Sequence, residues 1–339
     1  MAVYSKSGGG RDGRFKIALA RHVIVIGILL IYGGTLCADN LRIAYSAING
    51  AQAPIWLAVE ENIFRRYNLN VELVYIGGGS VVTNALISRD VHLARVGPNS
   101  VVQASLRGAN LKMIANTVNT LLGYLMVRPI ISSPKDLIGK RIGVTRLAGN
   151  TDYALEFVLR KYGLQRGKDV AVLQTGGLPQ LLGALSVGAV DAGLLTPPSN
   201  MQALKLGLKQ LVDVSSLGML YPNSVVATNG EFLKRNRELI LRFLRAYGEG
   251  ISRMSKDRGA TIKAFIKYTK EQDPNILADL YELYGVKQLE KIPYVKIEAV
   301  EEVLRTEGIK SGQVDPTSFV DNSLVAQLES EGFFKKLYQ

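Results

Sequence analysis

Short apolar runs alternate with longer segments of helical spacing through the first third of the chain. The runs at residues 41–45, 71–75, 91–96 and 111–116 predict buried strands. Short strands that alternate with helices of about 10–15 residues form parallel β-α-β units. The pattern therefore predicts the α/β class, with helices expected at 54–67, 80–88 and 98–107.

The same pattern returns 99 residues later without a gap, because residues 42–113 align with residues 141–212. The spaced set Pro98, Ser100, Gln103, Ala104 and Gly108 reappears as Pro197, Ser199, Gln202, Ala203 and Gly207. Two copies with this period predict two similar lobes with one strand order rather than a solenoid. Proline at the first helical position, as at Pro98 and Pro197, fits a helix start. The second copy is expected to form strands 141–145, 170–174, 190–195 and 210–214 and helices 151–162, 178–187 and 197–206.

Two further apolar runs lie outside the repeat, at residues 123–127 and 223–228, and predict short strands. They are the expected crossings between the lobes, so we place the hinge near 117–127 and 215–226. Beyond residue 228 the apolar positions follow helical spacing, and we expect this tail to pack on the first lobe. The helices expected in the tail are 231–254, 258–270, 274–284, 296–308 and 322–329.

These elements predict a two-lobed fold in which each lobe is a mostly parallel sheet flanked by helices. Two strands would form the hinge, and a ligand would bind between the lobes. The predicted division is a separate segment at 1–38, lobe 1 at 39–122 and 223–339, and lobe 2 at 123–222.

The first 38 residues have the features of a secretory signal peptide. Basic residues precede an uncharged apolar run at 23–32, and small residues then lead to Ala38. The run is too short for a membrane span, which needs about 20 residues, although an uncleaved anchor is the alternative. Cys37 is the one cysteine in the sequence, so no disulfide framework is expected. A lipid anchor on Cys37 is the alternative to cleavage after Ala38.

The formal net charge of +12 favours anionic ligands or surfaces, although a basic surface also serves solubility. The basic residues are scattered and no aromatic-basic motif accompanies them, so nucleic acid is not an expected partner. After the first 38 residues the one histidine is His92, which lies in a predicted strand and is expected to be structural. No phosphate-binding loop or dinucleotide fingerprint is present, and no cofactor or metal is expected.

The candidate site lies in the strand-to-helix turns. In parallel sheets, ligands bind outside the carboxyl ends of the strands. The helices that begin there present free N–H groups and a positive dipole end, which favour anions. The four expected turns are 46–52, 77–80, 146–152 and 196–198. The candidate ligand-binding residues are Ser46, Asn49, Gly78, Gly79, Ser80, Arg95, Pro98, Asn150, Thr151, Asp152, Thr196 and Tyr221.

Several of these residues have two interpretations. Gly79 is expected to adopt a positive φ and let the backbone approach a ligand, while Ser80 contacts ligand or caps its helix. Arg95 could bind a carboxylate or sulfonate in a bidentate manner, or form a salt bridge. Asn150 and Thr151 bind ligand or cap a helix. Asp152 accepts a hydrogen bond from a ligand or stabilises the helix dipole.

Five motifs together resemble one family: Pro54-Ile-Trp-Leu-Ala, Gly77-Gly-Gly-Ser80, Asp136-Leu-Ile-Gly-Lys-Arg-Ile-Gly143, Gly149-Asn-Thr-Asp-Tyr153 and Gly188-Ala-Val-Asp191-Ala. The chain resembles, over roughly residues 40–335, the solute-binding proteins of nitrate/sulfonate/taurine ABC importers. These proteins share their fold with thiamine-pyrimidine precursor synthases. By position, the resemblance implies Ser46, Gly79, Ser80, Pro98, Thr151 and Tyr221 as residues of the cleft.

The resemblance also implies a type II-like periplasmic binding protein that closes on a small molecule and delivers it to an ABC permease in the inner membrane. The implied protein is a non-catalytic monomer, located in the periplasm or otherwise outside the cytoplasm. The expected ligand is a small organic or inorganic anion, such as a sulfonate, a carboxylate or nitrate, or a related small molecule. An enzyme on the same fold, such as a pyrimidine precursor synthase, is the alternative. The enzymes that this fold resembles carry a cysteine-rich motif and histidines that the sequence lacks.

Overall fold

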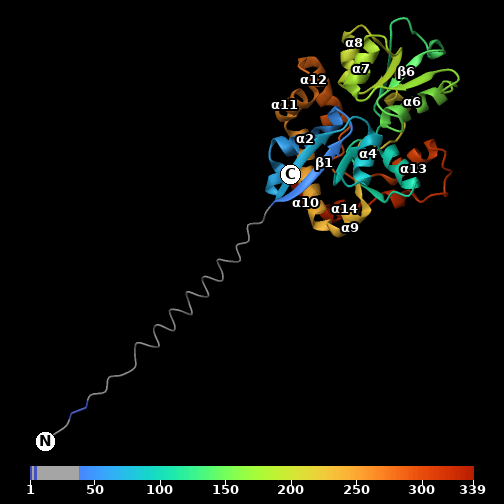
Figure 1. Cartoon of the computed structure of the whole chain (residues 1–339). Helices are drawn as coiled ribbons and strands as arrows, with labels where there is room; N and C mark the ends of the chain where they lie inside the picture. Colours follow the sequence, from blue (N-terminus) through green and yellow to red (C-terminus); the bar gives the residue numbers. More distant parts are fainter. Residues whose placement is uncertain (2–3, 6–37) are drawn as a thin grey trace. The chain divides into compact units, whose positions relative to one another are not determined.

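The computed structural model describes residue 1, residues 4–5 and residues 38–339 of the chain (Figure 1). The expected signal peptide lies almost entirely outside these residues. From Asp39 to Gln339 the chain forms one compact unit. Within the described residues, no helix combines the length and the apolar character that a membrane crossing requires.

The first sheet has five strands in the order β2-β1-β3-β10-β4. Its strands are β1 (Asp39–Tyr45), β2 (Leu69–Tyr75), β3 (Leu93–Val96), β4 (Leu111–Ala115) and β10 (Val225–Asn229). β1 pairs in parallel with both β2 and β3, whereas β10 runs antiparallel to β3 and β4. Four strands therefore point the same way, and their carboxyl ends meet at one edge.

The second sheet repeats this arrangement in the order β7-β6-β8-β5-β9. Its strands are β5 (Tyr124–Val127), β6 (Arg141–Val144), β7 (Ala171–Gln174), β8 (Ala192–Leu195) and β9 (Lys209–Asp213). Here β5 is the antiparallel strand, between β8 and β9. The shift of 99 residues maps β1 to β6, β2 to β7, β3 to β8 and β4 to β9. The predicted two-lobed fold and its shared strand order are confirmed.

The chain crosses between the sheets twice, and the two crossings run side by side. Thr120 and Leu220 form an isolated antiparallel bridge. The backbone N–H of Tyr221 donates to Asn119 O at 3.0 Å, and that of Asn223 donates to Val118 O at 2.8 Å. The crossings lie in the two segments that the sequence predicts as hinge. The residue boundaries assigned to the lobes remain a prediction.

The helices of the repeat follow the predicted order with two differences. The expected helix 54–67 is divided, because Asn62 between its halves adopts a left-handed φ of 54°. The helix expected to begin at Pro197 begins at Ser199, since a residue that precedes a proline is disfavoured in the helical region. The helices are α2 (Ala53–Glu60), α3 (Ile63–Arg66), α4 (Gly79–Ile87), α5 (Pro98–Leu106), α6 (Asn150–Lys161), α7 (Leu178–Ser186) and α8 (Ser199–Lys205). Short 3-10 turns occur at Gly50–Gln52, Pro134–Leu137, Ser215–Leu217 and Pro316–Phe319.

The C-terminal helices pack on the first sheet and its helices. The expected helix 231–254 is interrupted at Asn236, which has non-helical φ and ψ angles. Figure 1 shows α2 and α10 beside each other, and α13 packs against α5. The helices are α9 (Gly230–Arg235), α10 (Arg237–Lys256), α11 (Arg258–Thr269), α12 (Pro274–Tyr281), α13 (Ile297–Thr306), α14 (Ser323–Ser330) and α15 (Phe333–Tyr338), with a π-helical turn at Glu282–Lys287.

Trp56 and His92, which lie outside the candidate site, have structural roles. Trp56 is fully buried and stacks on Tyr268 with ring centroids 4.6 Å apart, so it belongs to the core. His92 precedes β3 instead of lying within it, because the strand begins at Leu93. Its Nδ1 accepts a hydrogen bond from the N–H of Arg42 at 2.9 Å, and its ring stacks on Phe232.

The packing of α10 on α2 allows a test of stability. A Cβ added at Gly250 would lie 2.2 Å from the carbonyl oxygen of Pro54, so the two helices touch through backbone. We expect Gly250→Val to lower the free energy of unfolding by about 1–3 kcal/mol through overpacking. Gly183 in α7 has no atom within 4 Å of such a Cβ. Gly183→Ala should therefore raise the same free energy by about 0.5–1 kcal/mol. Urea denaturation followed by circular dichroism measures both, and equal midpoints for both variants would contradict the expected packing.

Candidate functional site

A cavity lies where the carboxyl ends of the two sheets face each other. About 620 Å³ of space is not occupied by atoms there, with the opening to solvent included. All four predicted turns contribute to it, together with both crossings. Its lining residues are Ser46, Ala47, Asn49, Gln52, Gly78, Gly79, Gly97, Leu122, Gly123, Thr145, Asn150, Thr151, Ala154, Leu178, Leu194, Leu195, Thr196, Asn223 and Ser224.

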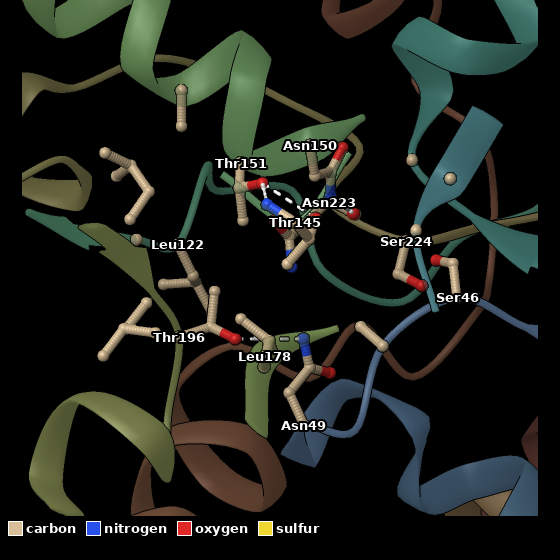
Figure 2. A pocket seen from close by; sticks show the side chains of 18 of the residues that line it. Ser46, Asn49, Leu122, Thr145, Asn150, Thr151, Leu178, Thr196, Asn223 and Ser224 are labelled. Atoms are coloured by element: carbon tan, nitrogen blue, oxygen red, sulfur yellow. Dashed lines mark hydrogen bonds between the residues drawn. The ribbon is translucent and has the colours of Figure 1, made fainter. Parts of the chain in front are cut away.

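The two lobes touch each other around this cavity. On one side, Ser80 Oγ donates to Leu147 O at 3.1 Å, and Ser100 Oγ donates to Ala148 O at 2.7 Å. On another side, Asn49 Nδ2 donates to Thr196 Oγ1 at 3.4 Å, as Figure 2 shows. These bonds join residues of one sheet's turns to those of the other. The structure is therefore a closed arrangement of the lobes.

The polar wall is built on two helix N-termini, one from each lobe. Gly78 precedes α4 and Gly149 precedes α6, and neither helix start has a side-chain cap. The first N–H groups of a helix have no partner within the helix. A Cβ built on Gly149 would lie 3.6 Å from the backbone nitrogen of Gly79, so the two helix starts are close together. Free N–H groups from both lobes thus converge on the cavity.

Gly78 and Gly79, in the predicted turn 77–80, leave room for neighbouring atoms where the lobes meet. The prediction that Gly79 adopts a positive φ is wrong. The positive φ of 95° belongs to Gly78, whereas Gly79 is the first residue of α4. A Cβ on Gly78 would lie 2.0 Å from Cγ of Arg146 in the other lobe. A Cβ on Gly79 would lie 2.7 Å from Ser100 Oγ. Backbone geometry at Gly78 and lack of space at both positions require glycine here.

Asn150 and Thr151 line the cavity, but their side chains are already engaged. Thr151 Oγ1 accepts from the N–H of Thr145 at 2.9 Å, and the two threonine hydroxyls lie 2.8 Å apart (Figure 2). Asn150 Nδ2 donates to Asn223 O at 2.7 Å. Neither residue caps α6 in the predicted way, because Gly149 occupies the cap position. Their backbone N–H groups, in the first turn of α6, are what they can offer to a ligand.

Five predicted residues do not line the cavity, and three of them hold the lobes together or start a helix beside it. Ser80 bonds to the other lobe, as described above. Pro98 is the first residue of α5, next to the lining residue Gly97. Tyr221 is buried in the second crossing, with its hydroxyl 3.0 Å from Asn99 Oδ1. Burial raises the pKa of Tyr221 well above its ordinary value, so its hydroxyl stays neutral.

Asp152, the fourth of these residues, is used within lobe 2. Its Oδ2 accepts from the N–H of Ala148 at 2.9 Å, and its Oδ1 pairs with Arg166. Ala148 has a left-handed φ of 57°. The carboxylate therefore fixes the turn that contacts lobe 1, and it is not directed to the cavity.

Arg95, the fifth, lies behind the cavity wall. Its side chain is fully buried on the face of the first sheet that α10 covers. Nε donates to Gln52 Oε1 at 3.2 Å, Nη2 donates to Ala51 O at 2.6 Å, and Nη1 donates to the hydroxyl of Tyr247. Burial lowers the pKa of Arg95, yet arginine keeps its charge in proteins. The guanidinium thus holds the 3-10 turn that presents Gln52.

Asn49 is a lining residue whose amide oxygen is buried without a partner. Its side chain is 6% exposed, and Oδ1 has no hydrogen-bond partner among the described residues. A buried polar atom without a partner costs free energy unless water or ligand satisfies it. The closed lobes therefore leave one acceptor of a lining residue unsatisfied.

Sequence reasoning missed two groups of lining residues. The first group lies in or directly beside the predicted turns, strand ends and crossings, so its position in the sequence was a usable signal. This group comprises Gln52, Gly97, Gly123, Thr145, Asn223 and Ser224. The apolar residues carried no signal, because a leucine that faces a cavity looks like a leucine of the core. The apolar side of the cavity comprises Ala47, Leu122, Ala154, Leu178, Leu194 and Leu195.

No charged side chain lines this cavity in the part of the chain that the structure describes. Histidine, cysteine, lysine and tyrosine are also missing from that lining. Within residues 38–339 and the few others described, no cluster of three His, Cys, Asp or Glu side chains is placed to hold a metal ion. The cavity can therefore offer hydrogen bonds, helix dipoles and apolar contact.

Comparisons with known proteins agree with this architecture. The model of the NMT1/THI5-like family matches residues 49–259. The taurine-binding periplasmic protein of Escherichia coli K12 is 26% identical over 216 residues, which cover 62% of this chain and 64% of that protein. The alignment thus spans somewhat less than two thirds of that relative.

Two solved structures have the same fold. A protein of Bordetella bronchiseptica RB50 matches with a TM-score of 0.78 and 18% identity, over 86% of this chain and 98% of that one. The alkanesulfonate-binding protein SsuA of Xanthomonas axonopodis matches with a TM-score of 0.71 and 17% identity, over 84% and 99%. Because the family model covers more than half of the sequence, the chain belongs to the NMT1/THI5-like family, with the fold of periplasmic binding proteins.

Proposed function

We propose that the protein is the solute-binding component of an ABC importer, which captures a small anion between its lobes and delivers it to a membrane permease. The observation that carries this proposal is the cavity where two uncapped helix N-termini from different lobes converge. Helix N-termini bind anions through free N–H groups and the positive end of the dipole. Release to a permease requires the lobes to separate, and the paired crossings provide the hinge for that motion.

The class of ligand is a sulfonate, a carboxylate or a nitrate-like anion. The E. coli relative is named for taurine, and the Xanthomonas structure is named for alkanesulfonates. Leucines on one side of the cavity suit a short apolar group, while the helix starts suit an oxyanion. The proposed binding residues are the lining members of the predicted set, which are Ser46, Asn49, Gly78, Gly79, Asn150, Thr151 and Thr196.

Binding without catalysis is favoured over the alternative of a pyrimidine precursor synthase. General acid–base catalysis needs a side chain that can exchange a proton within reach of the substrate. The cavity lining consists of neutral amides, hydroxyls, glycines and aliphatic side chains. A wall of this kind can hold a ligand but gives it no proton donor or acceptor of suitable pKa.

We further propose that the mature protein acts outside the cytoplasm as a monomer that meets its permease in the inner membrane. The basic, apolar and small-residue pattern of the first 38 residues supports export. Cleavage after Ala38 is the proposed processing, with a lipid anchor on Cys37 as the alternative.

The first test of this function is a ligand screen on the purified protein. Sulfonates, carboxylates, nitrate and neutral pyrimidines are added in turn while the melting temperature is measured. We expect anions to raise the melting temperature, because a ligand that binds only the folded state stabilises it. Proton NMR of the same mixtures should show an unchanged ligand after prolonged incubation. Stabilisation by pyrimidines alone, with conversion to a product, would favour the enzyme.

Asn49 provides a test of the site itself. Asn49→Ala should weaken ligand binding by about 0.5–1.5 kcal/mol, roughly a two- to twelve-fold rise in Kd, through loss of a neutral hydrogen bond. Asn200 is a matched control, since it is also buried with an unpartnered Oδ1 but lies outside the cavity lining. Asn200→Ala should leave Kd unchanged. Calorimetric titration with the anion from the screen measures both values, and equal effects of the two substitutions would remove Asn49 from the site.

Export is tested on the protein recovered from the producing cell. N-terminal sequencing should find a chain that begins near residue 39, because small residues at 37–38 fit a signal peptidase site. A lipid on Cys37, detected by mass spectrometry, would establish the anchored form instead. An intact Met1 on a membrane-bound product would contradict both forms of processing.

A further inference from the structure

Arg95 is a buried cation without a carboxylate partner. Its side chain is fully buried, and it takes part in no salt bridge with any described residue. Its three hydrogen-bond partners, Gln52, Ala51 O and Tyr247, are neutral. Removal of a charge from water is costly unless an opposite charge lies close. The closed protein therefore holds an uncompensated positive charge.

A single side chain separates this charge from the cavity. Gln52 Oε1 accepts a hydrogen bond from Nε of Arg95, and Gln52 Nε2 donates to Ser224 Oγ at 3.2 Å. Both Gln52 and Ser224 line the cavity. Figure 2 shows Ser224 beside Ser46 at the edge of the same space. Arg95 thus fixes the orientation of the Gln52 amide, with the N–H end on the side of Ser224.

The described part of the chain places no negative charge within the cavity. Its lining there includes no aspartate or glutamate. Asp152, the next residue after the lining residue Thr151, pairs with Arg166. Asn49 Oδ1 is an unpartnered acceptor in the wall, but a neutral amide oxygen cannot balance an ammonium group. A ligand amine would therefore be buried without a counter-charge.

We infer that the cavity selects small monoanions with an apolar tail, that Arg95 balances the ligand's charge through Gln52, and that ligands with an ammonium group are rejected. This inference rests on the proposed binding function and narrows its ligand class. Arg95 is a positioning residue here, since Gln52 stands between it and the cavity. The oxyanion would lie at the helix starts and the tail against the leucines.

The inference predicts that this protein rejects taurine, the ligand for which its E. coli relative is named. Taurine and propane-1-sulfonate have the same length and the same sulfonate, and differ in a terminal ammonium in place of a methyl group. A cavity with leucines and no carboxylate should accept the methyl group and exclude the ammonium. Calorimetric titration should give a Kd for propane-1-sulfonate at least about 100-fold below that for taurine, since an unpaired buried charge is strongly destabilising.

A second pair of probes measures the part played by charge. Propane-1-sulfonamide is neutral and nearly the same shape as propane-1-sulfonate. We expect the anion to bind at least about tenfold more tightly, because charge-assisted hydrogen bonds exceed neutral ones. In Arg95→Met this ratio should fall, because the anion loses affinity while the neutral probe does not, although the helix starts retain part of the preference. Arg95→Lys should restore part of the ratio.

Two further variants separate this role from a merely structural one. Arg242 also donates to backbone carbonyls in lobe 1, those of Tyr67 and Asn68, but lies outside the cavity. Arg242→Met should reduce stability and leave the anion-to-neutral ratio unchanged. If Arg95→Met does not fold, Gln52→Glu replaces it. The introduced carboxylate should pair with Arg95 and raise the melting temperature of the variant. Its affinity for the sulfonate should fall at least about 100-fold while the sulfonamide still binds.

The outcomes distinguish failure of the inference about ligand charge from failure of the proposed binding function. Tight binding of taurine, or equal binding of sulfonate and sulfonamide, overturns the inference but leaves the protein a solute-binding protein. An unchanged ratio in Arg95→Met or Gln52→Glu removes Arg95 from charge compensation. If no sulfonate, carboxylate or nitrate binds at all, both the inference and the proposed function fail.

Discussion

The exchange of one strand between the two halves is the constraint on which the other features depend. β10 lies between β3 and β4 in the first sheet although it follows the second copy of the repeat, and β5 lies between β8 and β9 in the second sheet although it precedes that copy. The first sheet is complete only after the chain has crossed to the second sheet and returned. The crossings pair with each other and supply Leu122, Gly123, Asn223 and Ser224 to the cavity. Hinge and cavity are thus consequences of one topological feature.

Close approach of the lobes then determines which residues the turns can contain. Arg146 lies where a Cβ on Gly78 would be, and the start of α6 lies against the start of α4. Side chains that could have capped these helices are missing or engaged elsewhere, as Thr151 is with Thr145. Helix N–H groups consequently remain free where both lobes contribute them. In the proposed function, closure and anion recognition therefore depend on the same glycines.

The architecture was predictable from sequence, whereas the direction of individual side chains was not. The strands, their shared order in the two lobes and the crossings follow from apolar periodicity and the 99-residue repeat, which are local and repeated signals. The four turns were located for the same reason. Arg95 was placed at the correct sheet edge, but the face of the sheet it occupies depends on Tyr247, which lies in a helix far along the chain. Leu178 and Leu195 could not be told from core residues, since a cavity wall and a core have the same apolar composition.

Burial explains why charged residues near the site serve different purposes. Asp152 and Arg166 remain partly exposed and neutralise each other, so their field is screened by water. Arg95 is removed from water, and a charge in that setting acts with less screening over a longer distance. A cation of this kind need not touch a ligand to influence it. A neutral wall with one buried cation behind it can therefore discriminate charge while its contacts remain hydrogen bonds and aliphatic surfaces.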